Sequence, residues 1–125
     1  MKRFVSHYLY IPTYGFLKQY VIEINSNGHV STLYPLIEEA ESIIWVPGVI
    51  LLITPEQLSE MEKELQDSEK QTTFFKQEYI KTELPVEYNN MFDSELIAYR
   101  LYPFDFAKMQ PSEGARLQPL DNFIF

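Results

Sequence analysis

One uninterrupted apolar stretch in the middle of the chain limits the possible folds more than any other feature. Residues 43–53 read Ile-Ile-Trp-Val-Pro-Gly-Val-Ile-Leu-Leu-Ile. This stretch is too short to cross a bilayer as a helix, because a spanning helix needs about 20 apolar residues. We therefore predict two short strands, over residues 42–45 and 48–53, divided at Pro47-Gly48. The second strand is apolar throughout after its glycine, so we expect it to be buried on both faces.

The segment after this stretch carries the signals of a helix start. Thr54, Pro55 and Gln57 have the types and spacing of an N-cap, a first helical residue and the end of a capping box. Apolar residues then recur at helical spacing as far as Leu65, with acidic residues over most of the remaining surface. We predict an amphipathic helix that runs to about Ser68.

The N-terminal third alternates with the period of a β-strand. Strands are predicted over residues 4–11, 17–25 and 29–34. Asn27-Gly28 suits the positive φ angles of a tight turn between the second and third strands. Three sequential strands joined by short turns predict an antiparallel meander.

The C-terminal half is less regular. Residues 95–102 alternate and predict a further strand, whereas residues 107–119 are rich in turn formers and predict a loop. Residues 70–84 fit a second amphipathic helix or a strand. The expected fold over residues 1–125 is therefore a single α+β domain. It contains a mainly antiparallel sheet of five or six strands, similar to a small β-sandwich, with one clear amphipathic helix.

Composition disfavours several classes of partner. The 125-residue chain has a net charge of −8, and its ten basic residues are scattered. Nucleic acids and anionic membranes are bound through clustered basic residues, so we expect neither as a partner. The chain has no cysteine, which excludes disulfides and thiolate metal sites. Because no apolar signal core follows the basic start, we expect a cytoplasmic protein.

Candidate catalytic groups are sparse. His7 and His29 are the only histidines, so a three-histidine metal site is impossible, although two histidines and a carboxylate remain conceivable. His7 shares its predicted strand face with apolar residues, which favours a core or boundary position, and His29 is expected to be solvated. Neither a glycine-rich phosphate loop nor a nucleophile elbow is present. We expect no cofactor and no enzymatic activity.

Aromatic residues are the most unusual feature of the N-terminal third. Tyr8 and Tyr10 share a predicted strand face with Phe4, and Trp45 lies in the central apolar stretch. Such rings either fill a two-layer core or form an exposed surface for a partner. We take Tyr8, Tyr10 and Trp45 as the candidate binding residues. A protein partner or self-association through this sheet face is expected, and a small-molecule site lined by these rings is the alternative.

The first 53 residues also carry short motifs in a defined order. These are Lys2-Arg3-Phe4, Val21-Ile22-Glu23-Ile24, Asn27-Gly28-His29-Val30, Pro35-Leu36, Glu38-Glu39, and Trp45 followed by Gly48-Val49-Ile50-Leu51. In this order they resemble the N-terminal part of amidohydrolase-superfamily proteins of the cytosine deaminase and chlorohydrolase kind. The resemblance implies a small β-sandwich domain, which in that family precedes a metal-dependent (β/α)₈ barrel.

The resemblance does not extend to the catalytic residues of that family. There, the strand that begins with glycine leads to a His-x-His pair that binds the metal, and counting from Gly48 places this pair near Leu58 and Glu60. No histidine follows His29, and a barrel needs about 200 residues or more. The resemblance therefore implies a non-catalytic relative of the β-domain, or a partner of such a hydrolase.

Overall fold

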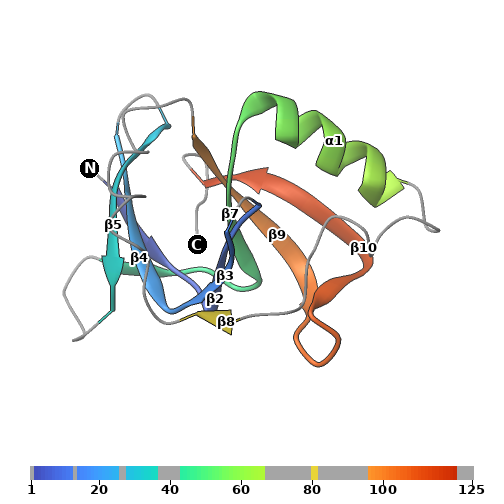
Figure 1. The fold of residues 1–125 in the computed structure, drawn as a ribbon, viewed down its shortest axis with the longest axis horizontal. Helices are drawn as coiled ribbons and strands as arrows, with labels where there is room; N and C mark the ends of the chain where they lie inside the picture. The colour runs from blue at the N-terminus through green and yellow to red at the C-terminus, as the bar shows by residue number, and fades with distance from the viewer. Residues whose placement is uncertain are drawn as a thin grey trace.

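A computed structural model of the chain consists of two β-sheets and one helix (Figure 1). It describes residues 2–12, 14–25, 28–36, 43–66, 80–81 and 96–120. The four-stranded sheet has the order β5 (Val30–Pro35), β4 (Tyr20–Ile24), β1 (Lys2–Val5), β6 (Ile43–Trp45). The six-stranded sheet has the order β10 (Gln110–Pro119), β9 (Ile97–Asp105), β7 (Val49–Ile53), β2 (Tyr8–Ile11), β3 (Gly15–Lys18), β8 (Ile80–Lys81). The helix α1 spans Pro55–Gln66.

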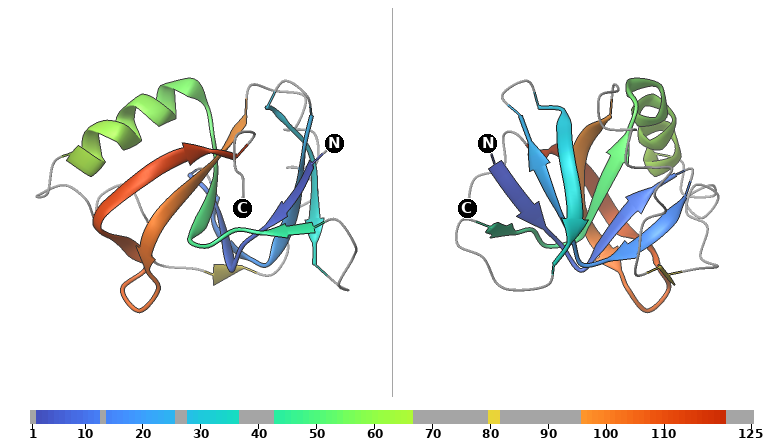
Figure 2. Two further views of the ribbon diagram at one scale, coloured as in Figure 1. Left: turned by 180° about the vertical axis from the view of Figure 1, so that it is seen from behind. Right: turned by 60° about the vertical axis from the view of Figure 1, so that its left-hand side comes forward.

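Three segments of the chain pass from one sheet to the other. Strands β1 and β2 are separated only by Ser6 and His7, and β3 and β4 only by Gln19; the link from β6 to β7 is also short. Strands that switch sheets at a bend are a known way to form the corner of a packed two-sheet structure. Figure 2 shows these strands diverging from their shared corner.

Backbone hydrogen bonds join the three bends to one another. The Gln19 amide donates to the His7 carbonyl at 3.1 Å, and the Val46 amide donates to the Val5 carbonyl at 2.8 Å. Gln19 adopts a positive φ of 53°, which a non-glycine residue rarely does and which turns the chain sharply. The three bends therefore lie side by side and form one corner between the two sheets.

The α+β class is confirmed, but the sheets are mixed where a mainly antiparallel arrangement was expected. The predicted antiparallel pairing is present, since β1 pairs with β4, β2 with β3, and β4 with β5. The strands predicted over residues 4–11 and 17–25 are not continuous, because each bends into two strands that lie in different sheets. However, β6 is parallel to β1, and β7 is parallel to β2. The short β8 is likewise parallel to β3. The pairs β1–β6 and β2–β7 are parallel because the central apolar stretch runs alongside the first segment in the same direction.

The glycine of the predicted turn and the predicted helix start are confirmed. Gly28 has a φ of 80°, and its amide donates to the Asn25 carbonyl at 3.0 Å, which closes the turn between β4 and β5. At the start of α1, the Gln57 amide donates to Thr54 Oγ1 at 3.2 Å. The Thr54 amide in turn donates to Gln57 Oε1 at 3.0 Å, which completes the capping box.

Two apolar clusters hold the layers together, and β7 contributes to both. Ile50 and Leu52 lie in the cluster between the two sheets, whereas Val49, Leu51 and Ile53 lie in the cluster beneath α1. All five residues of β7 are completely buried, so the prediction that this strand is buried on both faces is confirmed. The pattern fits a central strand covered on one face by the second sheet and on the other by a helix.

The loop predicted for residues 107–119 is wrong over most of its length. Residues 110–119 form β10, which pairs with β9 with a register shift between Pro111 and Arg116. Prolines and a glycine are tolerated here because β10 ends the strand order and contains an irregularity, the two settings in which such residues occur in sheets. Turn-forming composition therefore hid an edge strand.

Some predictions fall outside the described residues. The assignment of residues 70–84 is one of them, apart from Ile80–Lys81, which pairs with β3.

The predicted strand over residues 95–102 is confirmed from Ile97, and β9 extends further, to Asp105. Within the described ranges, no helix has the length and apolar character needed to cross a membrane.

Candidate functional site

Aromatic rings form a continuous series from the surface to the cluster beneath α1. Ring centroids lie 6.0 Å apart for Trp45 and His7, 5.9 Å for His7 and Phe106, and 5.7 Å for Phe106 and Tyr8. The series continues inward from Tyr8 to Phe16 at 6.1 Å. All four centroid distances lie within the range in which aromatic pairs interact favourably.

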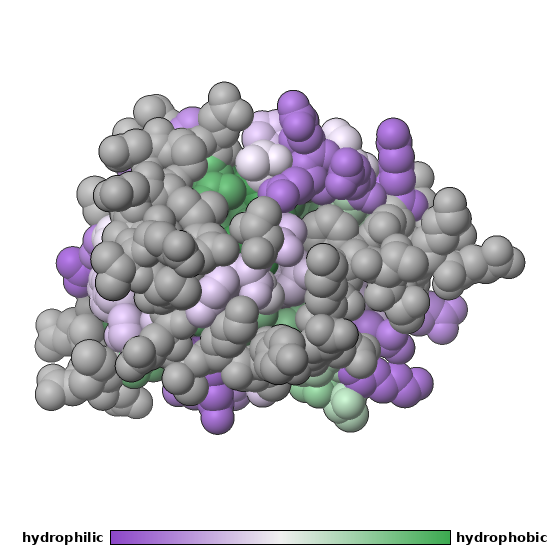
Figure 3. All heavy atoms as spheres, viewed as in Figure 1, coloured by the Kyte–Doolittle hydropathy of each residue, from purple (hydrophilic) through white to green (hydrophobic). Residues whose placement is uncertain are grey.

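The outer end of this series is exposed. Trp45 retains 43% and Phe106 retains 38% of its accessible surface, His7 is exposed, and Tyr8 is half-buried. We call these four residues the aromatic corner. In Figure 3, hydrophobic side chains are visible at the bottom of the view, where the β9–β10 hairpin lies in Figure 1.

Separate segments of the chain bring these rings together. Tyr8 begins β2, His7 lies in the bend before it, Trp45 ends β6, and Phe106 follows β9. Parallel pairing of β1 with β6 places Trp45 beside Val5, two residues before His7. Asp105 closes the turn after β9. Its Oδ1 accepts hydrogen bonds from the backbone amides of Ala107, at 3.0 Å, and Lys108, at 3.1 Å.

The aromatic corner lies on the outer side of the bend between the sheets. Side chains on the inner side enter the cluster between the sheets, as Phe4, Leu9 and Ile44 do. Trp45 follows Ile44 in the same strand and therefore faces the opposite way. Tyr8 packs against the cluster beneath α1, on the other face of its sheet from Leu9. Trp45 and Tyr8 thus face away from the cluster between the two sheets.

The predicted binding residues occupy three different environments. Trp45 is exposed and Tyr8 is half-buried, and both lie in the aromatic corner. Tyr10 is 1% exposed and packs against Phe16 with ring centroids 4.6 Å apart. Tyr10 is therefore not part of an accessible surface, and its inclusion in an exposed sheet face is wrong. The alternative, that such rings fill the core, is correct for Tyr10 and for the fully buried Phe4.

The two histidines also differ from expectation. His7 is exposed, not a core or boundary residue, because the bend at Ser6 and His7 interrupts the alternation of the predicted strand. His29 is half-buried at the start of β5, where its amide donates to Asn25 Oδ1 at 3.1 Å. Within the described part of the chain, no group of three histidine, cysteine or acidic side chains is placed to hold a metal ion.

Phe106 was missed by the sequence reasoning, although a signal for it exists. Tyr102, Phe104 and Phe106 recur at every second position, which is the strand period. The alternation continues past Pro103, beyond the predicted strand end at residue 102. Proline is compatible with strand ends and irregular positions, so the aromatic alternation was the better guide.

Lysines flank the aromatic corner. Lys18 is exposed and lies opposite Tyr8 in the antiparallel pair of β2 and β3. Residues opposite each other in such a pair share a sheet face, with Cβ atoms about 4.5–5.5 Å apart. Lys108 is exposed two residues after Phe106. One lysine is thus beside Tyr8 by strand register and a second is close to Phe106 in sequence, in a chain of net charge −8.

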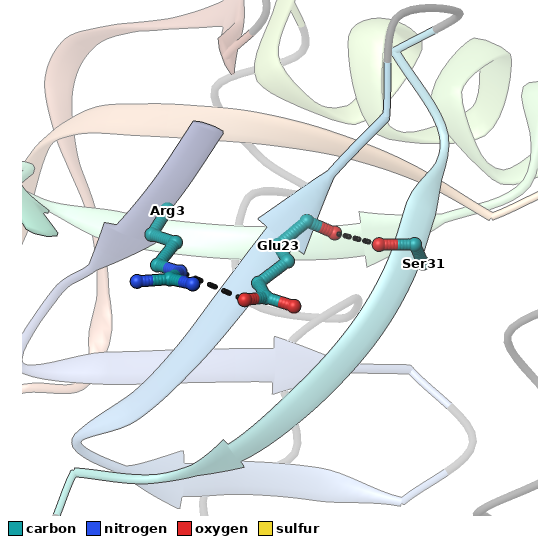
Figure 4. A network of polar contacts seen from close by, with 3 residues as sticks. All are labelled: Arg3, Glu23 and Ser31. Carbon is teal, nitrogen blue, oxygen red and sulfur yellow. Dashed lines mark hydrogen bonds and ion pairs between the residues drawn. The ribbon is translucent and has the colours of Figure 1, made fainter. Parts of the chain in front are cut away.

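The outer face of the four-stranded sheet carries a group of polar contacts. Arg3 Nε donates to Glu23 Oε1 at 2.8 Å across the β1–β4 pair, and Ser31 Oγ donates to the Glu23 carbonyl at 3.1 Å (Figure 4). The two side chains of the ion pair satisfy each other, so this arrangement is explained by sheet stability alone.

Comparison with protein-family models, with curated proteins and with solved structures gave no match. The amidohydrolase-like motifs of the first 53 residues therefore remain an expectation from sequence, and the functional argument depends on the geometry of the aromatic corner.

Proposed function

We propose that this protein is a non-catalytic interaction module that binds a protein partner through the aromatic corner. The observation that carries the proposal is the contact of three exposed rings, Trp45, His7 and Phe106, from three separate segments. Grouped exposed apolar side chains mark interaction sites on soluble proteins. Aromatic residues are also enriched among the side chains that dominate binding energy.

The shape of the site supports a protein partner over a small ligand. Small-molecule sites are concave and enclose most of the ligand surface, whereas these rings lie on the outer side of a bend. A small-molecule-binding protein with an aromatic-lined pocket remains the alternative function. A metal-dependent hydrolase is one candidate partner, because of the motifs in residues 1–53.

A pair of matched double variants tests the proposal. Trp45→Ala/Phe106→Ala removes two rings of the corner, and Tyr34→Ala/Tyr102→Ala removes two rings of similar exposure outside it. Wild type and both variants are immobilised and exposed to an extract of the source organism, and retained proteins are identified by mass spectrometry. Circular dichroism first establishes that both variants are folded.

A retained protein is then purified, and its affinity for each variant is measured by titration calorimetry. We expect the corner variant to bind at least about thirtyfold more weakly, because one interface hot spot contributes about 2 kcal/mol. The control variant should bind as wild type does. Equal losses in both variants, or retention of no partner by wild type, would contradict the proposal.

A further inference from the structure

We infer that the aromatic corner recognises an acidic segment of its partner, one in which carboxylates adjoin apolar anchor side chains. This inference rests on the proposed function and specifies the chemistry of the partner. It follows from the lysines beside the rings and from the distribution of charge between the strands and the rest of the chain.

Lys18 is the best-placed of these lysines. The β2–β3 register sets it beside Tyr8 on one sheet face, and Tyr8 contacts the exposed ring of Phe106. Lys18 is also exposed, so its ammonium group can reach a carboxylate carried by a segment that lies on the rings. Lysine stems cover apolar surface while their charged ends remain in water.

Lys108 is a second exposed lysine, two residues after Phe106 in the chain. The nearest acid in sequence, Asp105, accepts the amides of Ala107 and Lys108 through Oδ1 and so has a structural role in the turn. A bound segment would meet apolar rings at the centre and basic groups at the rim. This arrangement is typical of interfaces in which apolar anchors supply affinity and charge supplies orientation.

The described strands carry more basic than acidic residues, although the chain as a whole is acidic. Six of the ten basic residues but only three of the eighteen acidic residues lie in the described strands. The acidic groups lie elsewhere, for example on α1, where Glu56, Glu60 and Glu62 are exposed. Lys18 is the one of these six basic residues that strand register sets beside a ring of the corner, and it can attract negative charge there.

A nucleic acid is a poorer fit than a peptide. A phosphate backbone is held by several basic residues along its path, and its affinity depends on neutralising many charges. Two lysines are close to the rings in the part of the chain that the structure describes, and the net charge of −8 would repel a long polyanion. A short acidic segment requires few charge contacts, because apolar anchors contribute most of the binding energy.

Peptide selection tests the inference with the intact chain. A random peptide library displayed on phage is selected on immobilised wild-type protein, after depletion on Trp45→Ala/Phe106→Ala. Selected peptides are synthesised with a fluorescent label, and their affinities are measured by fluorescence polarisation. Lys18→Glu tests the rim charge, and Lys63→Glu is the matched control, because Lys63 is exposed on α1. In Figure 1, helix α1 lies at the upper right and the tip of the β9–β10 hairpin at the lower right.

We expect the selected peptides to be net acidic with aromatic or aliphatic residues. Lys18→Glu should lower their affinity by about tenfold, since reversing a rim charge replaces attraction by repulsion. Lys63→Glu should leave it unchanged, and added salt should weaken binding.

Two results would separate failure of the inference from failure of the proposed function. Peptides that need Trp45 and Phe106 but are neutral or basic, or are equally sensitive to both lysine variants, would overturn the inference alone. If no selected peptide depends on Trp45 and Phe106, both the inference and the proposed function are overturned. A concentration-dependent dimer in sedimentation equilibrium, lost in Trp45→Ala/Phe106→Ala, would identify a second copy as the occupant and overturn the peptide inference.

Discussion

The backbone carbonyl oxygen of Leu101 occupies the space that a side chain at Gly48 would need. A Cβ built at Gly48 would overlap this oxygen and would also lie 3.2 Å from Cβ of Tyr102. Gly48 has a φ of 93°, a conformation that favours glycine. The close approach brings β9 against β7 at the point where the central stretch leaves the corner.

Gly48→Ala should therefore destabilise the protein by about 2–4 kcal/mol, because it adds backbone overlap to an unfavourable φ. Gly114→Ala is the matched control. Gly114 also has a positive φ, of 78°, but no atom lies within 4 Å of its Cβ position, so we expect a loss of only about 1 kcal/mol. Urea unfolding followed by circular dichroism gives both values. Equal losses would mean that the contact with Leu101 is unimportant.

Met61 fastens α1 to the six-stranded sheet. It is 1% exposed and lies in the cluster beneath the helix, whereas hydrophilic side chains cover the outside of α1 at the upper right of Figure 3. Met61→Ala should lower the free energy of unfolding by about 2–5 kcal/mol, as other deletions of buried side chains do. The exposed Glu62 provides the comparison, and Glu62→Ala should change the value by less than about 0.5 kcal/mol. Similar values for the two variants in urea unfolding would refute this packing.

The Thr54 hydroxyl caps α1, so its removal should cost about 1 kcal/mol. Thr54→Ala leaves the Gln57 amide without the Oγ1 acceptor seen at 3.2 Å. Thr54→Ser retains a hydroxyl and should recover most of the lost stability. The midpoints of thermal unfolding for wild type and the two variants provide the test. If the serine variant is no more stable than the alanine variant, the hydroxyl does not act as a cap.

The ion pair of Arg3 and Glu23 should contribute little. The Arg3 side chain is 44% exposed and that of Glu23 is 15% exposed, and pairs near the surface are typically worth about 0.2–1 kcal/mol. A double-mutant cycle with Arg3→Ala and Glu23→Ala should give a coupling in this range, which decreases in about 1 M salt as screening increases. A coupling that does not change with salt would show that the contact is not mainly electrostatic.

Trp45 should be needed for binding more than for stability. Trp45 and Phe16 stand at opposite ends of the aromatic series, with exposed fractions of 43% and 0%. Phe16→Ala should cost about 3–5 kcal/mol, whereas Trp45→Ala should cost well under half of that, because much of its ring is already in water. Chemical denaturation compares the two directly. A comparable loss for Trp45→Ala would indicate a core role for this ring.

Local sequence signals predicted those features that adjacent residues can form by themselves. The Asn25–Gly28 turn, the capping box of Thr54 and Gln57, and the burial of Val49–Ile53 were all found as expected. Each depends on backbone conformations or side-chain types within a few residues. The exposure of His7 was not predictable in this way. The alternating sequence pattern continues through residues 6 and 7, but the strand itself is interrupted there by a bend that turns the His7 side chain outward.

Periodicity and turn chemistry are local, so they were sufficient to predict the α+β class, the helix after the apolar stretch and the antiparallel pairing of the first third. The choice of parallel strands, the bends of three segments at one corner, and the rings that meet at the surface depend on tertiary packing. Trp45, His7 and Phe106 lie far apart in the sequence, and their contact depends on the β1–β6 pairing and on the hairpin after β9. Such long-range pairing is set by the packing of whole sheets, so no local pattern encodes it.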